Sequence, residues 1–325
     1  MTQRPPAVFG TGLLALDVIV SARPDVSPRL AAGGTCGNVL SILSYMGWRS
    51  FPIARLGGDP QSQLVREELG RAGVSLRFLE QTPPAPTPVF VQTIRQDRSG
   101  KVSHRFSTNC PACGAWLPSY RPVTAAAARQ VLATLEEDGA DMRQAVFFFD
   151  RASRGALVLA QWFKDKGALI VFEPAGKGEP RLFAEAVAVA DILKYSAERV
   201  SVETRSACAS SPPLLEIETR AAEGLRYRSH ITGTAWRHLG SAPAPRVVDT
   251  AGAGDWCTAG LLFALGCSSE ALSAHQPEAL EHALRVGQSL AALACGHEGA
   301  RGLMAAVSRS DLLKSAGLTS SAEFH

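Results

Sequence analysis

The chain has 325 residues, of which 46% are hydrophobic and 19% are charged, close to the composition of an ordinary globular protein. This composition excludes a fibrous repeat or a wholly disordered chain, and the length allows one large domain or two small ones. The formal net charge is only +3. It gives no sign of the basic face that nucleic-acid binding needs, so we expect no nucleic acid as partner.

Short apolar runs alternate with amphipathic stretches along the chain, which predicts strands alternating with helices. The strands are expected at 7–9 and 16–20 (one strand continuing past a glycine turn), 51–56, 89–94, 101–106, 145–149, 168–172, 192–193, 214–218 and 224–228. The helices are expected at 38–46, 61–71, 123–138, 155–166, 181–190, 254–265, 278–294 and 310–313.

Buried strands that alternate with helices predict an α/β fold, with a mostly parallel central sheet flanked by helices on both faces. Two hairpin-like segments, at about 17–32 and 88–106, stand outside that alternation and predict a small β lid that is discontinuous in sequence. We therefore expect a single α/β domain over residues 1–325 that carries this lid.

The seven cysteines are an odd number, whereas a secreted disulfide framework normally has an even count. Free thiols are typical of the cytoplasm, which is the expected location. No apolar run reaches the ~18 residues of a membrane-spanning helix, so no membrane partner is expected. Cys110 and Cys113 form a C-x-x-C pair that could bind a metal or form a redox pair, although free thiols are favoured.

The most informative segment is Asp249-Thr250-Ala251-Gly252-Ala253-Gly254-Asp255. It is expected to connect a strand at 246–248 with the helix at 254–265. Small residues let a ligand approach the backbone, and the free N–H groups of a first helical turn favour an anion. The negative charge of Asp255 would repel a phosphate there. A carboxylate at this position makes sense if it removes the proton of a hydroxyl that attacks the phosphate. The plain alternative is a helix-terminal aspartate beside a tight glycine turn.

The same segment resembles the D-T-x-G-A-G-D signature of the ribokinase-like (PfkB) carbohydrate kinases. Other motifs of that family agree in order over nearly the whole chain: Gly33–Asn38 resembles G-G-x-x-x-N, Arg55–Asp59 a G-x-D strand end, Thr219–Gly224 T-x-G-x-x-G, and Gly299-Ala300 a C-terminal G-A. Ala190–Glu198 resembles the segment that reads K-x-S-x-x-E, with the spacing of Glu198 shifted by one position. The resemblance implies a ribokinase-like fold and a phosphotransferase that moves a phosphoryl group from ATP to a hydroxyl of a sugar or sugar-like substrate.

The resemblance also implies a role for individual residues. Asp255 would be the general base, and the backbone N–H groups of Gly252, Ala253 and Gly254 would stabilise the charge on the transferred group. Substrate hydroxyls would bind at Asp17, Gly33, Gly34 and Asn38. The nucleotide would bind at Lys194, Thr219, Gly224 and Gln288. Glu198 would hold Mg²⁺ through water, and backbone oxygens at Asp249 would hold a monovalent cation such as K⁺.

Some of these residues have plain structural alternatives. Asn38 could be the N-cap of a helix, Lys194 a surface lysine and Glu198 a solvated glutamate. Two departures from the family pattern bear on the ligands. Glu173 stands where many sugar kinases have the aspartate of Asp-x-Asn, and Ala221 replaces the glycine of T-x-G.

Two other functions stay open. A nucleoside kinase of the same fold would stack its substrate on lid aromatics, for which Phe90 and Phe106 are candidates. A non-catalytic sensor would bind a sugar or nucleotide without turnover. A dinucleotide fingerprint at Gly10–Ala15 lacks the required helix and gives a dehydrogenase little support. The exposed edges of a β lid favour a homodimer.

Overall fold

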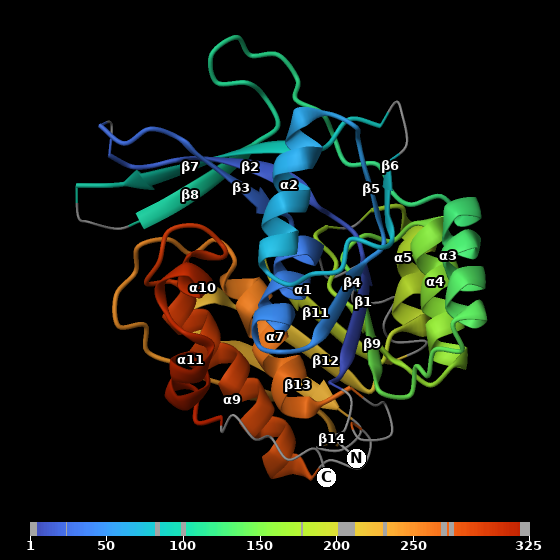
Figure 1. The fold of residues 1–325 in the computed structure, drawn as a ribbon. Coiled ribbons are helices and arrows are strands. Elements are labelled where there is room, and N and C mark those ends of the chain that lie inside the picture. The colour runs from blue at the N-terminus through green and yellow to red at the C-terminus, as the bar shows by residue number, and fades with distance from the viewer. Residues whose placement is uncertain are drawn as a thin grey trace.

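The computed structural model describes residues 5–23, 25–81, 85–98, 102–176, 178–200, 212–229, 233–267, 272 and 276–318. An eight-stranded sheet runs through its centre in the order β14-β13-β12-β11-β10-β9-β1-β4 (Figure 1). These strands are β1 (Ala7–Thr11), β4 (Arg49–Pro52), β9 (Ala145–Phe149), β10 (Leu169–Phe172), β11 (Ile192–Ser196), β12 (Leu215–Thr219), β13 (Leu225–Ser229) and β14 (Gly233–Leu239). All pair in parallel except β13 and β14, which are antiparallel additions at one edge.

Helices cover both faces of this sheet, as Figure 1 shows. One face carries α1 (Thr35–Tyr45), α7 (Ala253–Leu265) and α9 (Pro277–Ala294), and the other carries α3 (Ala125–Glu137), α4 (Arg154–Asp165) and α5 (Pro180–Val189). Strand β9 shows why helices must cover both faces of the sheet. Its five residues are all apolar and buried, with Phe148 packing into one core and Phe147 and Phe149 into the other, as expected of a strand covered on both sides. The expected α/β architecture, with a mostly parallel central sheet flanked by helices on both faces, is confirmed.

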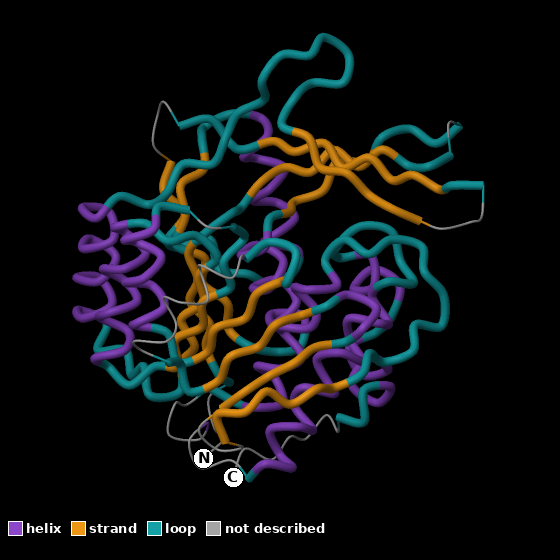
Figure 2. The backbone as a smooth tube through the Cα atoms, turned by 180° about the vertical axis from the view of Figure 1, so that it is seen from behind, coloured by secondary structure: helices purple, strands orange, loops and turns teal. Residues whose placement is uncertain are grey.

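A second sheet stands apart from the central one (Figure 2). It consists of β2 (Ala15–Val20), β3 (Arg29–Gly33), β7 (Val89–Gln96) and β8 (Val102–Ser107), in the order β3-β2-β7-β8. We call this four-stranded sheet the lid. Strand β2 runs parallel to β7, so that Asp17 lies beside Phe90. Residues 10–15 enter this lid without forming a helix, so the structural context of a dinucleotide fingerprint is absent there.

The remaining elements connect these layers. They are α2 (Pro60–Arg71), the pair β5 (Ala54–Leu56) and β6 (Leu79–Gln81), the short 3₁₀ helix η1 (Ala221–Glu223), α10 (Gly302–Ala306) and α11 (Arg309–Ser315). Among the helices of the described residues, none is long and apolar enough to cross a membrane.

Three local predictions were wrong. The expected continuous strand at 7–20 is two strands in different sheets, because Gly12 (φ 151°) turns the chain out of the central sheet. The expected strand at 51–56 divides into β4 and β5. Residues 246–248 form no strand. The N–H groups of Val248 and Asp249 both donate to the carbonyl of Cys295, at 2.8 and 3.2 Å, and therefore not to a sheet.

Candidate functional site

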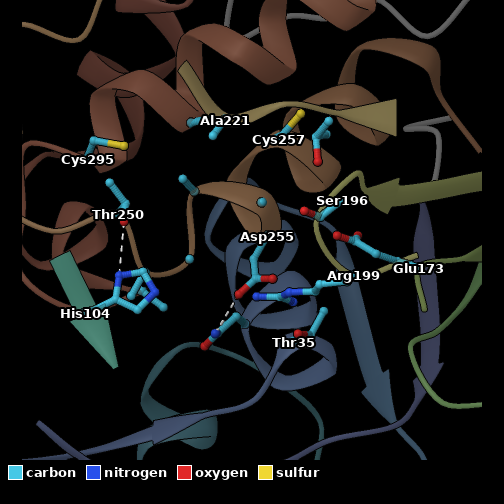
Figure 3. Close-up of a pocket in the computed structure, with 18 of the residues that line it drawn as sticks. Thr35, His104, Glu173, Ser196, Arg199, Ala221, Thr250, Asp255, Cys257 and Cys295 are labelled. Carbon is cyan, nitrogen blue, oxygen red and sulfur yellow. Dashed lines mark hydrogen bonds between the residues drawn. The ribbon is translucent and has the colours of Figure 1, made fainter. Parts of the chain in front are cut away.

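A pocket of about 730 Å³ lies between the lid and the carboxyl ends of the central strands, within the size range of small-molecule sites. The lid contributes Asp17, Phe90, Gln92, His104 and Phe106 to its lining. The central sheet contributes residues at the ends of β10, β11 and β12, and the beginning of α7 forms one wall, as Figure 3 shows. Parallel α/β sheets characteristically bind ligands at this edge.

The wall at α7 is a helix N-terminus, a feature that favours an anion. Gly252 caps the helix with φ 79°, and a Cβ at this position would collide with Ala300, so only glycine fits. The N–H of Ala253 donates to the carbonyl of Thr250 at 3.3 Å, whereas no described residue accepts from the N–H of Gly252 or Gly254. Two free N–H groups and the helix dipole therefore face the pocket.

Asp255 lies in the first turn of α7 and is 8% exposed. Its Oδ2 accepts a hydrogen bond of 2.7 Å from Nδ2 of Asn38 on α1, drawn as a dashed line in Figure 3. Burial raises the pKa of Asp255 to about 7, with a smaller contribution from the negative charge of Glu173, while Asn38 and Lys194 act in the opposite direction. A carboxyl group with this pKa can both accept and release a proton near neutral pH.

A buried ion pair lies behind Asp255. The ammonium of Lys194 is 2.5 Å from Oε1 of Glu173 and donates to the carbonyl of Gly254 at 3.1 Å. Oε2 of Glu173 accepts a short hydrogen bond of 2.5 Å from Thr258 of α7. This network ties the ends of β10 and β11 to the first turns of α7. Because Lys194 is 1% exposed, the alternative of a surface lysine is wrong.

The loop before α7 is held by the fully buried carboxylate of Asp249. It accepts N–H groups of Ala251 at 3.0 Å and Gly299 at 2.9 Å, and the side-chain amide of Gln92 at 2.7 Å. A second lid residue, His104, places Nδ1 3.0 Å from the hydroxyl of Thr250 (Figure 3) and 3.6 Å from Asp249. The lid thus holds the loop before α7 directly through polar contacts.

Asp17 lies on the pocket side of the lid. Gly33 packs against its carboxyl group, where a Cβ would collide, so this close approach needs glycine. Burial raises the pKa of Asp17 to about 7, which the positive charge of Arg301 partly offsets and the negative charge of Glu68 reinforces. Arg301 in turn lies 3.3 Å from Glu68. Gly34 also lines the pocket, at the start of α1.

At the opposite end, β12 and the turn after it line the pocket. Thr219 ends β12, and its hydroxyl donates to the carbonyl of Tyr195 at 3.3 Å. Ala221 has φ 48° and is the single non-glycine residue with positive φ among those that the structure describes. Gly224 closes the turn with φ 93°, packed against the backbone of 239–241. Ala221 thus adopts a left-handed conformation that is usually reserved for glycine.

Two buried amide oxygens in the pocket lack a hydrogen-bond partner among the described residues, namely Oδ1 of Asn38 and Oε1 of Gln288. Unsatisfied acceptors of this kind are rare in folded proteins and suit a ligand that donates hydrogen bonds. Asn38 is interior to α1, whose N-cap is Gly34. The alternative of a capping asparagine is therefore wrong.

Comparison with known proteins agrees with this geometry. Residues 215–306, which include the loop at Asp249 and the start of α7, match the family model for the pfkB family carbohydrate kinases. Over this segment the chain is similar to the pfkB family carbohydrate kinases, and its fold is the ribokinase-like one. The comparison with curated proteins finds no match.

Solved kinases share the fold over nearly the whole chain. The Salmonella enterica aminoimidazole riboside kinase, complexed with aminoimidazole riboside and an ATP analogue, is 20% identical with a TM-score of 0.68, covering 95% of this chain and 99% of that one. Arabidopsis thaliana ribokinase, with ribose and ATP, is 21% identical (TM-score 0.67, 98% and 100% covered). A Vibrio cholerae fructokinase mutant, with fructose, ADP and potassium, is 19% identical (TM-score 0.66, 93% and 96% covered).

The structure brings most of the expected site residues into one pocket. Its lining includes Asp17, Gly34, Asn38, Lys194, Glu198, Thr219, Gly224, Gly252, Ala253, Gly254, Asp255 and Gln288. Gly33 and Asp249 lie behind the lining, where they support Asp17 and the loop before α7. Glu198 is exposed and follows β11 in a turn, not a helix.

Sequence reasoning missed Gln92 and His104 as parts of this site, and it noted Glu173 only as a departure from the family pattern. A charged residue directly after the buried strand at 168–172 was a usable signal for Glu173. Gln92 is a polar residue among apolar neighbours, on the strand face that it shares with Phe90. Within the described residues, no group of three or more His, Cys, Asp or Glu side chains is placed to hold a metal ion, so a zinc site at Cys110 and Cys113 finds no further ligands there.

Proposed function

We propose that the protein is a kinase that transfers the γ-phosphoryl group of ATP to a hydroxyl of a sugar or sugar-like substrate, with Asp255 as the general base. The observation that carries this proposal is the position of the Asp255 carboxylate beside the free N–H groups of Gly252 and Gly254. A base next to an anion site is the arrangement that attack by a hydroxyl on a phosphate requires.

The ionised carboxylate of Asp255 accepts the proton as the acceptor hydroxyl attacks. Its pKa of about 7 is well matched to this task at neutral pH. The N–H groups of Gly252 and Gly254 stabilise the negative charge that develops on the transferred group. One such donor is typically worth about 3 kcal/mol in the transition state. Asn38 orients the base through its 2.7 Å hydrogen bond.

We assign the two unsatisfied amide oxygens to different ligands, one to the acceptor and the other to the nucleotide. Oδ1 of Asn38, with Asp17 beside the closely packed Gly33, suits hydroxyl groups of the acceptor. Oε1 of Gln288 suits an amino group such as that of adenine, near Thr219 and Gly224. We propose that Lys194 contributes positive charge to the nucleotide side through its position beneath Gly254.

Magnesium and a monovalent cation belong to the same proposal. Mg²⁺ usually binds through one or two carboxylates, several waters and the phosphates of the substrate, so it needs no cage of protein ligands. Glu198 lines the pocket with an exposed carboxylate and fits such water-mediated binding. When bound, Mg²⁺ neutralises phosphate charge. The carboxylate of Asp249 is occupied by N–H donors, so K⁺ would bind backbone oxygens near Asp249 and Ala251.

The test is ADP formation with ATP, Mg²⁺ and a panel of pentoses, hexoses, inositols and nucleosides, with and without K⁺. Asp255→Asn serves as the matched blank because it preserves the shape of the site. We expect ADP production that depends on one acceptor class and vanishes in the variant. Binding of acceptors without turnover across the whole panel would instead support the sensor.

A nucleoside acceptor is the second candidate, and the lid aromatics favour it. Phe90 and Phe106 both line the pocket, and Phe106 remains 44% exposed. An exposed ring facing a pocket can stack on a planar base. If the acceptor is a nucleoside, Phe106→Leu should raise its KM about tenfold while leaving the KM for ATP unchanged. An unchanged KM for both would favour a simple sugar.

We further propose that the kinase is a cytoplasmic homodimer. The described cysteines are free thiols, which suits a reducing compartment. Strands β3 and β8 are the outer strands of the lid, and such edges can pair with a second subunit. Light scattering coupled to size-exclusion chromatography tests this, with a monomer mass as the contrary result.

A further inference from the structure

Cys110 and Cys113 lie on the turn 108–117, which follows β8 and rises above the lid in Figure 1. This turn is closed by its own hydrogen bonds. The N–H of Cys110 donates to the carbonyl of Ala115, and the N–H of Gly114 donates to the carbonyl of Cys110, both at 2.8 Å. The two cysteines are therefore held in a defined turn, in which Cys113 is exposed and Cys110 is partly buried.

The second of these bonds places the two thiols on the same side of the chain. A bond from the N–H of residue i+4 to the carbonyl of residue i forms one turn of helix. Side chains three residues apart are neighbours in such a turn. The Cys113 side chain contributes to lowering the pKa of the Cys110 thiol, which agrees with this proximity. Cβ atoms of such neighbours are about 5–6 Å apart and a disulfide needs about 3.8 Å, so the turn must tighten by roughly 2 Å to close the disulfide.

The two sulfur atoms also differ in their chemical character. The sulfur of Cys110 accepts the backbone N–H groups of Cys113 and Ala112, which lowers the pKa of its thiol. Burial instead raises the thiol pKa at the described cysteines of the protein core, Cys36, Cys257, Cys267 and Cys295. A stabilised thiolate at the surface is the typical setting of a reactive cysteine.

We propose that Cys110 and Cys113 form a reversible dithiol–disulfide site that exchanges with small-molecule disulfides. The Cys110 thiolate attacks one sulfur of glutathione disulfide, whose S–S bond breaks to release one glutathione thiolate. The Cys113 sulfur, after losing its proton, attacks the Cys110 sulfur of this mixed disulfide and releases the second glutathione. Two protein thiols are oxidised, one glutathione disulfide is reduced to two thiols, and the released thiolates take up the two protons.

The site is joined to the lid. The limb that returns from the turn ends at Pro118, whose carbonyl accepts the N–H of Val89 at 3.1 Å. Val89 begins β7, the strand that places Phe90 and Gln92 in the pocket. The segment that carries the two cysteines is therefore linked by a backbone hydrogen bond to a strand that lines the pocket. The exchange reaction itself does not depend on the proposed kinase substrate.

The experiment treats the folded full-length chain with glutathione disulfide and identifies the products by peptide mass spectrometry after alkylation. We expect loss of two hydrogen atoms, an intramolecular disulfide between Cys110 and Cys113, and reversal by dithiothreitol. In Cys113→Ser, a stable glutathione adduct should accumulate on Cys110. In Cys110→Ser, glutathione should add to Cys113 at least tenfold more slowly. Cys267→Ser is the matched control and should behave as the unaltered chain.

Three results would overturn the proposal. The first is that both thiols are alkylated as fully after treatment as before it. The second is that glutathione attaches to other cysteines first. The third is that the chain in urea forms the disulfide as fast as the folded chain, since the turn would then contribute nothing; we expect the folded chain to react at least tenfold faster.

Discussion

Nδ2 of Asn38 and Oδ2 of Asp255 are joined by a 2.7 Å hydrogen bond although 217 positions separate them in the chain. Asn38 belongs to α1, which follows the lid strand β3, and Asp255 belongs to α7. Because this bond favours the ionised form of Asp255, it affects both the orientation and the proton affinity of the proposed base.

Asn38→Leu should raise the pH at which the enzyme becomes active. The variant loses the hydrogen bond that lowers the pKa of Asp255, so the pKa rises further. Hydrogen bonds to charged groups are worth about 1.5–3 kcal/mol, which corresponds to roughly one pH unit or more. The acidic limb of kcat/KM should move to higher pH by this amount. An unmoved limb would show that this bond does not set the pKa of the base.

Substitution of the two charged residues behind Asp255 should shift the acidic limb of kcat/KM in opposite directions. Glu173 raises the pKa of Asp255 and Lys194 lowers it. Glu173→Gln should therefore move the acidic limb of kcat/KM to lower pH, and Lys194→Met to higher pH. Lys194→Met also leaves Glu173 unpaired and should reduce the free energy of unfolding by about 3–5 kcal/mol. Shifts in the same direction for both variants would contradict this assignment.

Gln92→Leu should reveal how much the contact between the lid and the loop before α7 contributes to kcat/KM. The variant removes the 2.7 Å bond to Asp249 while preserving much of the side-chain volume. We expect kcat/KM to fall about tenfold or more, because misplacement of a positioning loop is costly. Thr93→Val, at the neighbouring position on the opposite face of β7, is the control. Equal losses in both variants would indicate a general effect on the lid.

Ala221→Gly should stabilise the protein. Ala221 has φ 48°, a left-handed conformation that costs an L-residue roughly 1–2 kcal/mol relative to the right-handed one and that glycine adopts without strain. Thermal unfolding should therefore rise by a few degrees, with about 1 kcal/mol gained. Ala222→Gly, one position later, is the control and should gain nothing. A lower unfolding temperature for Ala221→Gly would contradict this strain.

The sequence predicted the layers and most of the candidate site because both depend on local patterns. The all-apolar run at 145–149 indicated a strand buried on both faces, which β9 confirms. The segment from Asp249 to Asp255 indicated an anion site at a helix start, and the pocket wall lies there.

The rest depended on contacts between distant segments. The turn at Gly12 moves the chain from one sheet to the other, and nothing in the local pattern of residues 7–20 distinguishes this from a single strand. The bonds from Gln92 and His104 to the loop at Asp249 likewise join segments about 150 positions apart in sequence. Such pairings are set by tertiary packing and not by the periodicity of either segment.

The most direct test of the account is the turnover number of Asp255→Asn with ATP and the best acceptor of the panel, measured at pH 8. The folded-state pKa of Asp255, about 7 against an ordinary 3.8, means that the stability contributed by its protonated form is lost as the pH rises through 7. The variant should therefore unfold at a temperature no lower than the unaltered chain at pH 8.

With the fold so verified, we expect Asp255→Asn to lower kcat by about 10³-fold or more, because general-base catalysis contributes about 10²–10⁴-fold. The KM for ATP should change little. A folded Asp255→Asn protein that retains more than about a tenth of the turnover would contradict the role of Asp255 as the base.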